Sequence, residues 1–268
     1  MQVPRGARSG PSVGHRGKMT LTAAVVTSSI GRDTLSDTIE AVQRQTYPAR
    51  HTVFVNGPEF HERGRAILER YPDVLACYLP APGTVKGVPG PESVYGAAPF
   101  LTTADVIFYC NDDDIYDPDH VASMMTLIER ERLDWAYSLR RIVGMDLAPV
   151  AEDDCESLGY WPCFYGPDAY LVDVSSYAVR RQTAISAAPG WYVSPIGDRV
   201  FLRALKQVAH AAGCTGRSTV RYRLQPGPGH GTNREFFERG NAKMTRRYPG
   251  GFPWRRETVF RRPEPSSR

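Results

Sequence analysis

The sequence predicts an α/β fold in which helices flank a mostly parallel β-sheet. The first observation behind this prediction is the alternation of strand-like apolar runs with helix-like segments over residues 21–110. The second is size, since 268 residues with 41% hydrophobic side chains suffice for one large α/β domain or two small ones. Residues after 110 alternate less regularly, so we expect that half of the sheet to be mixed.

Four strands are predicted in the first half of the chain, with helices between them. Leu21–Ser28 is rich in β-branched residues, and Asp33 is the expected N-cap of a helix that runs up to Tyr47-Pro48. Residues 80–91 are rich in Gly and Pro, which predicts a loop. The other predicted strands cover 51–55, 74–79 and 106–110, and the other predicted helices cover 61–70 and 92–103.

In the second half, Asp117 is expected to cap a helix opened by Pro118. This helix would bury an apolar side made of four residues, Val121, Met124, Met125 and Ile128. A later helix is predicted over 199–212, closed by Gly213. Further strands are predicted over 135–143, 169–174 and 218–224.

The net charge of +4 is unevenly distributed along the chain. Residues 1–18 carry four basic side chains and no acidic one, and residues 246–268 carry seven arginines against two glutamates. The body between these ends is therefore mildly acidic, which argues against a nucleic-acid-binding core. Residues 1–18 lack periodicity, so we expect them to be disordered, and Met19 could be the true start of the protein.

Several protein classes are excluded by what the sequence lacks. No run approaches the ~18 apolar residues that cross a bilayer, and the basic N-terminus lacks the apolar core of a secretory signal. The five cysteines form no CxxC pair, so we expect neither a disulfide framework nor a zinc site. We therefore expect a cytoplasmic protein without a transmembrane segment. Its strong preference for Arg over Lys is common in GC-rich bacterial genomes.

An acidic turn, Asn111-Asp112-Asp113-Asp114, follows the predicted strand 106–110. Ligands of parallel sheets gather at the carboxyl ends of the strands, where this turn lies. Hard divalent cations such as magnesium or manganese take carboxylate ligands together with phosphate oxygens. The turn therefore suits a metal–diphosphate complex, and the alternative is a solvated acidic turn that also caps the next helix.

At this point the sequence resembles a known family. Four segments carry the resemblance to glycosyltransferase family 2, which has the GT-A fold: Thr20–Ser29, Gln45–Pro48, 51–55 and Val106–Pro118. Within the last segment, the run Asn111–Pro118 is especially similar to the bacterial spore-coat polysaccharide glycosyltransferase of that family. The resemblance implies an inverting transferase that uses a UDP- or dTDP-sugar with Mn²⁺ or Mg²⁺. It divides the chain into a nucleotide-sugar-binding half, 19–115, and an acceptor-binding half, 116–245.

For the donor side, the resemblance implies that Asp113 binds the metal and that Asp112 faces the nucleotide ribose or the metal. Asp114 lies beside them, as a supporting residue or a further metal ligand. The implied donor pocket also includes Thr27, Ser28 and Arg32, from the end of the first strand and the loop after it.

Two features depart from the family on the donor side. Asn56-Gly57 replaces an acidic pair after the second strand, and an amide can still recognise uracil or thymine because it both accepts and donates. The alternative for this dipeptide is a simple turn. The helix before the fourth strand lacks the usual Arg over 93–98, which leaves Lys86 as a substitute near the diphosphate.

On the acceptor side, the resemblance implies that Asp198 is the catalytic base, and the alternative is a helix N-cap. Asp173 aligns with an acceptor-side acid, or else is a turn residue. Trp191 belongs to an aromatic-rich region that either stacks on the acceptor or closes a core. His230 would complete the metal shell, or else is merely exposed.

The C-terminal segment 246–268 is expected to form a basic tail. Its arginines occur largely in pairs, interleaved with four aromatic residues, Tyr248, Phe252, Trp254 and Phe260. We expect this tail to dock on an anionic acceptor or membrane surface, which would make the protein peripheral there. The alternative is a solvated tail that partly packs back on the body.

Two other functions remain open from the sequence. A nucleotidyltransferase on a similar sheet would have a Gly-rich basic loop after the first strand, whereas residues 27–32 contain one glycine. A non-catalytic sugar-nucleotide-binding protein would keep the fold without turnover. Release of pyrophosphate from a nucleoside triphosphate would favour the first, and donor binding without hydrolysis or transfer would favour the second.

Overall fold

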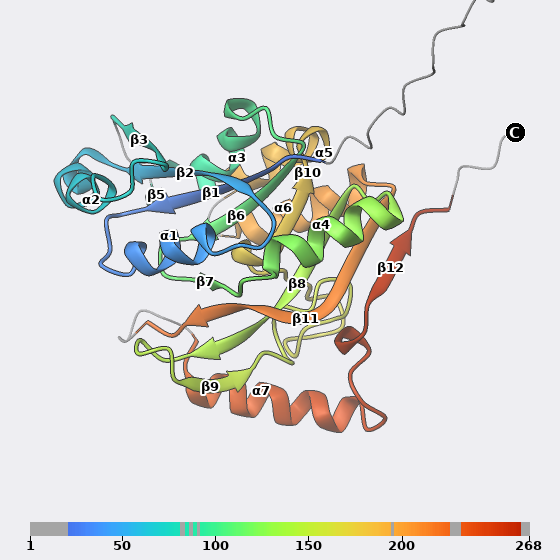
Figure 1. Ribbon diagram of the computed structural model, residues 1–268. Coiled ribbons are helices and arrows are strands. Elements are labelled where there is room, and N and C mark those ends of the chain that lie inside the picture. Colours follow the sequence, from blue (N-terminus) through green and yellow to red (C-terminus); the bar gives the residue numbers. More distant parts are fainter. Residues whose placement is uncertain are drawn as a thin grey trace, which may run out of the picture.

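The computed structural model describes residues 21–80, 84–85, 88–89, 92–193, 196–225 and 232–263. In these residues a curled ten-stranded sheet lies between two layers of helices (Figure 1). The α/β fold with a mostly parallel first half and a mixed second half is thereby confirmed. Predictions made for residues 1–18, Met19, Lys86 and His230 lie outside the described residues.

The first half of the chain forms the parallel part of the sheet, in the strand order β6-β1-β2-β3. All seven residues of β1 are buried, which explains why its sequence reads as a continuous apolar run. The strands are β1 (Ala23–Ser29), β2 (Ala49–Asn56), β3 (Leu75–Leu79) and β6 (Val106–Asn111). The helices are α1 (Leu35–Gln43), α2 (His61–Leu68) and α3 (Glu92–Leu101), and β4 (Thr84–Val85) pairs with β5 (Val88–Pro89) inside the predicted loop.

The second half completes the sheet in mixed orientation, in the order β6-β10-β8-β11-β12. β10 is antiparallel to both of its neighbours, whereas β11 is parallel to β8. The strands are β7 (Ile115–Tyr116), β8 (Trp135–Val143), β9 (Pro149–Glu152), β10 (Tyr177–Arg180), β11 (Ala211–Arg223) and β12 (Thr258–Arg261). The helices are α4 (His120–Glu131), α5 (Arg181–Ala187), α6 (Gly197–Val208) and α7 (Arg234–Arg247).

Each face of the sheet is covered by its own set of helices. Apolar residues of α1, α2 and α4 pack on one face, and residues of α3, α5 and α6 pack on the other. The predicted apolar side of α4 is confirmed, because all four of its residues are fully buried. Both faces of the central strands are therefore removed from water, as a parallel sheet requires.

Two predicted elements in the second half are wrong. Residues 169–174 do not form a strand; the chain turns there into the short 3₁₀ helix Val174–Ser176 before β10. The predicted helix 199–212 ends at Val208, and Gly213 lies inside β11 instead of closing the helix. A Cβ at Gly213 would lie 2.5 Å from a Leu133 methyl carbon, so glycine permits close packing of β11 rather than a helix end.

The two predicted aspartate caps are also wrong. Thr34, not Asp33, precedes α1, and α4 begins after Asp119 rather than at Pro118. The Asp117 carboxylate instead accepts hydrogen bonds from the guanidinium groups of Arg141 and Arg221, at 2.7 and 3.0 Å. A charged partner binds a carboxylate more strongly than a single backbone amide does, and these partners are remote in sequence.

The segment from 246 to 263 is part of the folded body, so our prediction of a tail is wrong for these residues. β12 pairs with β11 at the edge of the sheet, as Figure 1 shows. Trp254 is fully buried, and its indole N–H donates to the Asp154 carboxylate at 2.8 Å. Arg255 forms an ion pair with the same carboxylate at 2.7 Å. The aromatic residues of the segment thus pack in a core, which agrees with the packed-back alternative.

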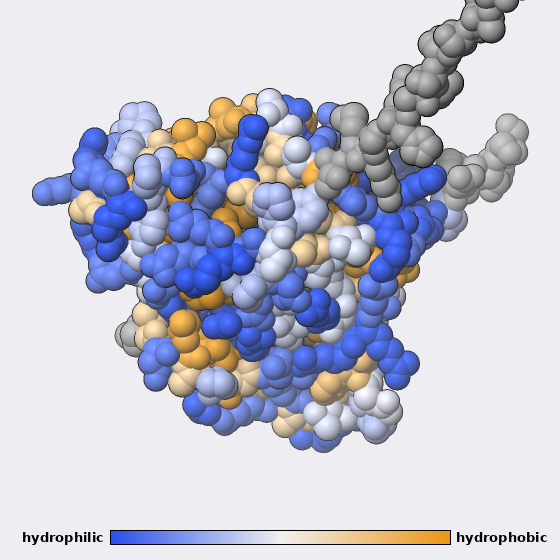
Figure 2. All heavy atoms as spheres, viewed as in Figure 1, coloured by the Kyte–Doolittle hydropathy of each residue, from blue (hydrophilic) through white to orange (hydrophobic). Residues whose placement is uncertain are grey.

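The surface of the described residues is mostly polar on the face shown in Figure 2, with smaller apolar patches among charged side chains. None of the helices in this part of the chain is both long and apolar enough to cross a membrane.

Replacing Trp254 with alanine tests the structural role of the C-terminal segment. We expect Trp254→Ala to lower the free energy of unfolding by about 3–5 kcal/mol, the usual cost of deleting a buried indole. Urea denaturation followed by circular dichroism measures this loss. Arg246→Ala, at an exposed position of α7, is the control and should stay within about 0.5 kcal/mol of the parent. Equal stability of both variants would contradict the packing described above.

Candidate functional site

The acidic turn lies at the carboxyl ends of two neighbouring parallel strands. β6 ends at Asn111 and β1 ends at Ser29, and the pairing places Ser28 opposite Asn111. Ligands of open parallel sheets bind in the crevice outside these ends. The three carboxylates of the turn have different hydrogen-bond partners and different exposure, so their roles differ.

The Asp112 carboxylate holds the loop that follows β1. It is buried and accepts hydrogen bonds from the Ser29 hydroxyl at 2.8 Å and the Ile30 amide at 3.0 Å. Its other oxygen forms an ion pair with the Arg32 guanidinium at 2.5 Å. From the resemblance we expected Asp112 to face the nucleotide or the metal, whereas in the structure it faces this loop. Asp112 therefore positions Arg32, which remains 38% exposed.

Asp113 is the member of the turn whose carboxylate is partly open. Its side chain is 14% exposed, accepts a hydrogen bond from the Gln225 amide at 2.7 Å, and lies 3.7 Å from the Arg32 guanidinium. Burial and the negative charge of Asp112 raise the pKa of Asp113 above its usual range. Because a nearby cation favours the charged carboxylate, a metal ion bound here would remove this penalty.

Asp114 supports the turn from inside the protein. Its carboxylate accepts hydrogen bonds from the Ser175 hydroxyl at 2.5 Å and the Asn111 amide at 3.1 Å. Burial and the charges of Asp173 and Asp113 raise its pKa well above the usual range. The residue is 1% exposed, so the structure favours the supporting role over the metal-ligand role that we also predicted.

The described residues offer a metal ion one accessible carboxylate at this turn. No group of three or more His, Cys, Asp or Glu side chains in this part of the chain is arranged to hold a metal. Magnesium is commonly bound by one or two carboxylates, while substrate phosphates and water fill its other positions. Asp113 fits that kind of site, and the predicted ligand His230 lies outside the described residues.

Three predicted donor-site residues are buried at the ends of β1 and β2. Thr27 is fully buried, and its hydroxyl lies 2.9 Å from Nε2 of His51 on the neighbouring strand, so it does not face an open site. Ser28 and Asn56 are 6% and 5% exposed. Asn56 ends β2 beside Gly57, whose φ of 129° is a conformation that favours glycine. The turn that we considered for this dipeptide is present, and base recognition by Asn56 stays a prediction.

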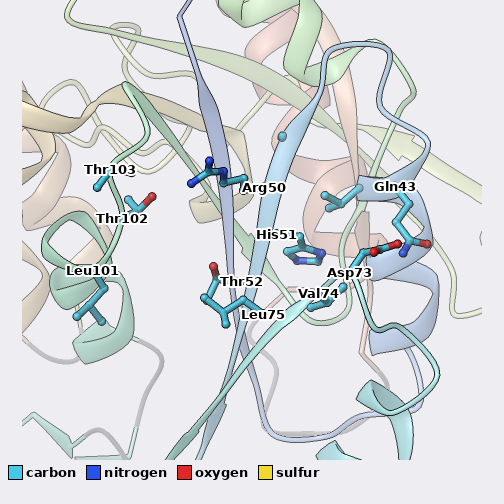
Figure 3. Close-up of a pocket in the computed structure, with 12 residues that line it drawn as sticks. Gln43, Arg50, His51, Thr52, Asp73, Val74, Leu75, Leu101, Thr102 and Thr103 are labelled. Atoms are coloured by element: carbon cyan, nitrogen blue, oxygen red, sulfur yellow. The ribbon is translucent and has the colours of Figure 1, made fainter.

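His51 also lines a cavity of about 470 Å³ at the opposite end of the sheet (Figure 3). The start of β2 forms one wall, where His51 and Thr52 point to opposite sides of the strand, as Figure 3 shows. Leu75 of β3 and Leu101 of α3 also line it. Burial lowers the pKa of His51 to about 3, so its imidazole is neutral. The cavity lies at the amino ends of the strands and is therefore separate from the acidic turn.

Asp198 lies in the first turn of α6 and not at its N-cap, which is Ile196. Its carboxylate accepts a hydrogen bond from the Arg199 amide at 2.7 Å, and this amide also donates to the Ile196 carbonyl at 3.1 Å. Its charge, together with burial as the larger cause, raises the pKa of Tyr177 well above the usual range. Because Tyr177 belongs to β10, next to β6, Asp198 lies on the side of α6 that approaches the sheet.

Asp173 and Trp191, predicted as acceptor-binding residues, are buried. Asp173 is 8% exposed; it caps the 3₁₀ helix Val174–Ser176 and forms an ion pair with Arg140 at 2.5 Å. Trp191 is fully buried and stacks on Phe201, with ring centroids 4.3 Å apart. These positions agree with the alternatives that we considered, a turn residue for Asp173 and a core residue for Trp191.

The sequence analysis missed a buried ion cluster beside the acidic turn. The Arg140 guanidinium of β8 is paired with Asp153 at 2.7 Å and with Glu156 and Asp173 at 2.5 Å each. Asp173 also caps the short helix that carries Ser175, which binds Asp114, so the cluster supports the acidic turn. The sequence pattern that could have predicted this cluster is the pair of arginines inside the apolar run 135–143, because a buried arginine needs carboxylate partners.

Gln225, which holds Asp113, was also missed. It lies two residues beyond the end of β11, and nothing in its local sequence marks it. Its role depends on the approach of β11 to the acidic turn, where β7 pairs with β11.

Comparisons with known proteins show the family to which this chain belongs. The model of the family described as "Glycosyl transferase family 2" matches residues 24–166, more than half of the chain, a range that includes the acidic turn and all of β1 except its first residue. A protein of Haemophilus influenzae described as uncharacterized is 42% identical over 52 residues, which are 19% of this chain and 35% of that protein. The chain thus spans about a third of the length of this relative.

Solved structures of S. aureus TarS share the fold. TarS 1-349 in complex with UDP-GlcNAc aligns with a TM-score of 0.59 at 11% identity, over 84% of this chain and 67% of that one. TarS 1-349 alone aligns with a TM-score of 0.58 at 9% identity, over 76% of this chain and 60% of that one. The likeness supports the GT-A fold predicted from the sequence, while similarity to the spore-coat enzyme stays a prediction. Through the family match over residues 24–166, the chain belongs to glycosyl transferase family 2.

Proposed function

We propose that this chain is an inverting, metal-dependent glycosyltransferase that moves a sugar from a UDP- or dTDP-sugar to an acceptor. The observation that carries the proposal is the partly open Asp113 carboxylate, held between Arg32 and Gln225 at the carboxyl ends of β1 and β6. Family membership supports sugar transfer. The TarS structures with UDP and with UDP-GlcNAc support a nucleotide-sugar donor of the uridine type.

The donor diphosphate would lie against Asp113 and Arg32. Asp113 would hold Mn²⁺ or Mg²⁺, and the bound ion would neutralise charge on the leaving diphosphate. Arg32 is already oriented by Asp112, so its exposed edge can donate to a phosphate oxygen without a large loss of side-chain freedom. Asn56 at the end of β2 would recognise the base, and Ser28 lies at the same edge of the sheet.

Asp198 would act as the base of a direct displacement. Its carboxylate would take the proton of an acceptor hydroxyl while the acceptor oxygen forms a bond to the anomeric carbon. The bond from that carbon to the diphosphate oxygen breaks in the same step, which inverts the configuration. A carboxylate in the first turn of α6 is held in place by the Arg199 amide, as a positioned base requires.

Asp113→Asn tests the metal–diphosphate site. We expect UDP with Mn²⁺ to raise the melting temperature of the parent protein by mass action, and this shift to disappear in Asp113→Asn because the metal loses its carboxylate. Differential scanning fluorimetry with and without excess chelator measures it. Asp119→Asn, at a carboxylate that is 42% exposed and paired with Arg217 just before α4, is the matched control and should keep the shift. Equal stabilisation of the parent by UDP in excess chelator would refute the metal role.

Asp198→Asn tests the base. The amide oxygen can still accept from the Arg199 N–H, so we expect the fold and the UDP affinity to be retained. Loss of the base should lower kcat for hydrolysis or transfer by roughly 10²–10⁴. Turnover of a nucleotide-sugar panel, with calorimetric titration of UDP on the same samples, measures both quantities.

The outcome of this second test also separates enzyme from binding protein. Turnover by Asp198→Asn close to that of the parent would show that another group takes the proton. Donor binding by the parent without any hydrolysis or transfer would instead favour the non-catalytic sugar-nucleotide-binding alternative.

A further inference from the structure

A second pocket of about 670 Å³ lies along α6, and three basic side chains line it. Arg199, Arg203 and Lys206 line it from the helix, and the loop 166–170 forms the opposite wall. None of the three basic side chains forms an ion pair with the residues that the structure describes. Asp168 is the single carboxylate of the described lining, so the pocket carries net positive charge.

The three basic residues share one face of the helix. They follow one another at spacings of four and three, which places their side chains along a single stripe of an α-helix. Arg199 and Lys206 are half-buried, and Arg203 is exposed at the rim. The positive charge is therefore gathered over the pocket rather than spread around the helix.

Aromatic rings hold two of these cations in place. The Lys206 amine lies 4.4 Å from the ring centre of Tyr160 and 4.1 Å from that of Tyr170, and it donates to the Gly159 carbonyl at 3.1 Å. The Arg199 guanidinium lies 5.4 Å from the ring centre of Tyr165. Cation–π contacts orient a charge without neutralising it, so these groups keep their capacity for an anion.

Burial of Lys206 makes an anionic ligand favourable. Removal from water lowers the pKa of its amine to about 8. An anion bound nearby would favour the charged form and offset this desolvation. An ammonium group has three N–H donors, and the structure shows one of them bound to the Gly159 carbonyl.

We propose that this pocket binds a phosphate group of the sugar acceptor. Two guanidinium groups and an ammonium group provide the charge and the paired donors that phosphate oxygens accept. The volume exceeds that of an inorganic phosphate, and tyrosine rings flank the charges, so a phosphorylated carbohydrate fits better than the free ion. Ile196 and Arg199, which line the pocket, flank Asp198 in the sequence, so the pocket adjoins the turn of α6 that carries the proposed base. The acceptor role of this ligand rests on the proposed function.

Calorimetric titration with glucose 6-phosphate tests the pocket, with UDP and Mn²⁺ present so that the donor site is filled. We expect the probe to bind the parent protein, and glucose, which lacks the phosphate, to bind far more weakly. Arg203→Glu should weaken the probe by at least about tenfold, because it reverses a charge at the rim. Arg203 is exposed, and Lys206→Met provides a second variant that removes charge without adding a carboxylate.

Arg246→Glu is the matched control, since it makes the same charge reversal on an exposed face of α7 away from the pocket lining. It should bind glucose 6-phosphate within about twofold of the parent, which excludes a general effect of net charge. Equal binding by Arg203→Glu, Lys206→Met and Arg246→Glu would overturn the proposal. Failure of the parent to bind the probe, or inorganic phosphate binding as tightly as glucose 6-phosphate, would overturn it as well.

This titration needs no turnover, so its failure differs from failure of the proposed function. If the protein binds glucose 6-phosphate through Arg203 and Lys206 but never consumes a nucleotide sugar, the phosphate site is supported and the transferase proposal fails. If the protein hydrolyses its donor while both pocket variants bind glucose 6-phosphate like the parent, the transferase proposal is supported and the phosphate site fails.

Discussion

The ion pair between Asp112 and Arg32 is the interaction on which the candidate site depends. It joins the end of β6 to the loop after β1, and the Ser29 hydroxyl and Ile30 amide complete the coordination of the same carboxylate. A buried carboxylate is costly unless charged and hydrogen-bonding partners surround it, so this set of contacts fixes both segments. Asp113, the next residue, is held at the edge of the crevice as a consequence.

A second set of contacts connects the acidic turn, in the parallel half of the sheet, to the mixed half. Asp114 is bound by Ser175, whose short helix is capped by Asp173, and Asp173 is paired with Arg140 of β8. Arg140 faces three carboxylates, and burial together with the neighbouring charge of Asp153 raises the pKa of Glu156 despite the attraction of Arg140. Loss of Arg140 would leave buried acidic groups without a counter-charge, so one guanidinium keeps the loops that carry Asp153, Glu156 and Asp173 folded near the acidic turn.

The parallel half of the sheet could be predicted because each of its strands and helices follows from a short, continuous sequence pattern. A run such as β1 is buried on both faces and therefore reads as a continuous apolar segment. The mixed half and the site depend instead on pairs remote in sequence, such as Asp112 with Arg32 and Asp173 with Arg140, which local patterns do not encode. The residue types at the acidic turn were informative, but the geometry was needed to distinguish its three carboxylates: one anchors a loop, one is partly open and one supports the turn from inside.

The roles of the basic residues also could not be predicted from local sequence patterns. Paired arginines near the C-terminus suggested an anion-binding tail, yet Arg255 is engaged by Asp154 and Glu152, and Arg261 by Glu131. In α6 the sequence shows three basic residues on one face of a helix, a pattern that ordinarily marks a solvated surface. What distinguishes that face is the opposing loop 166–170 and the absence of ion pairs for its cations in the described residues. A group of basic side chains can bind an anion where the fold encloses the group and leaves it without ion pairs. Among the described residues, the pocket along α6 meets that condition better than the C-terminal segment does.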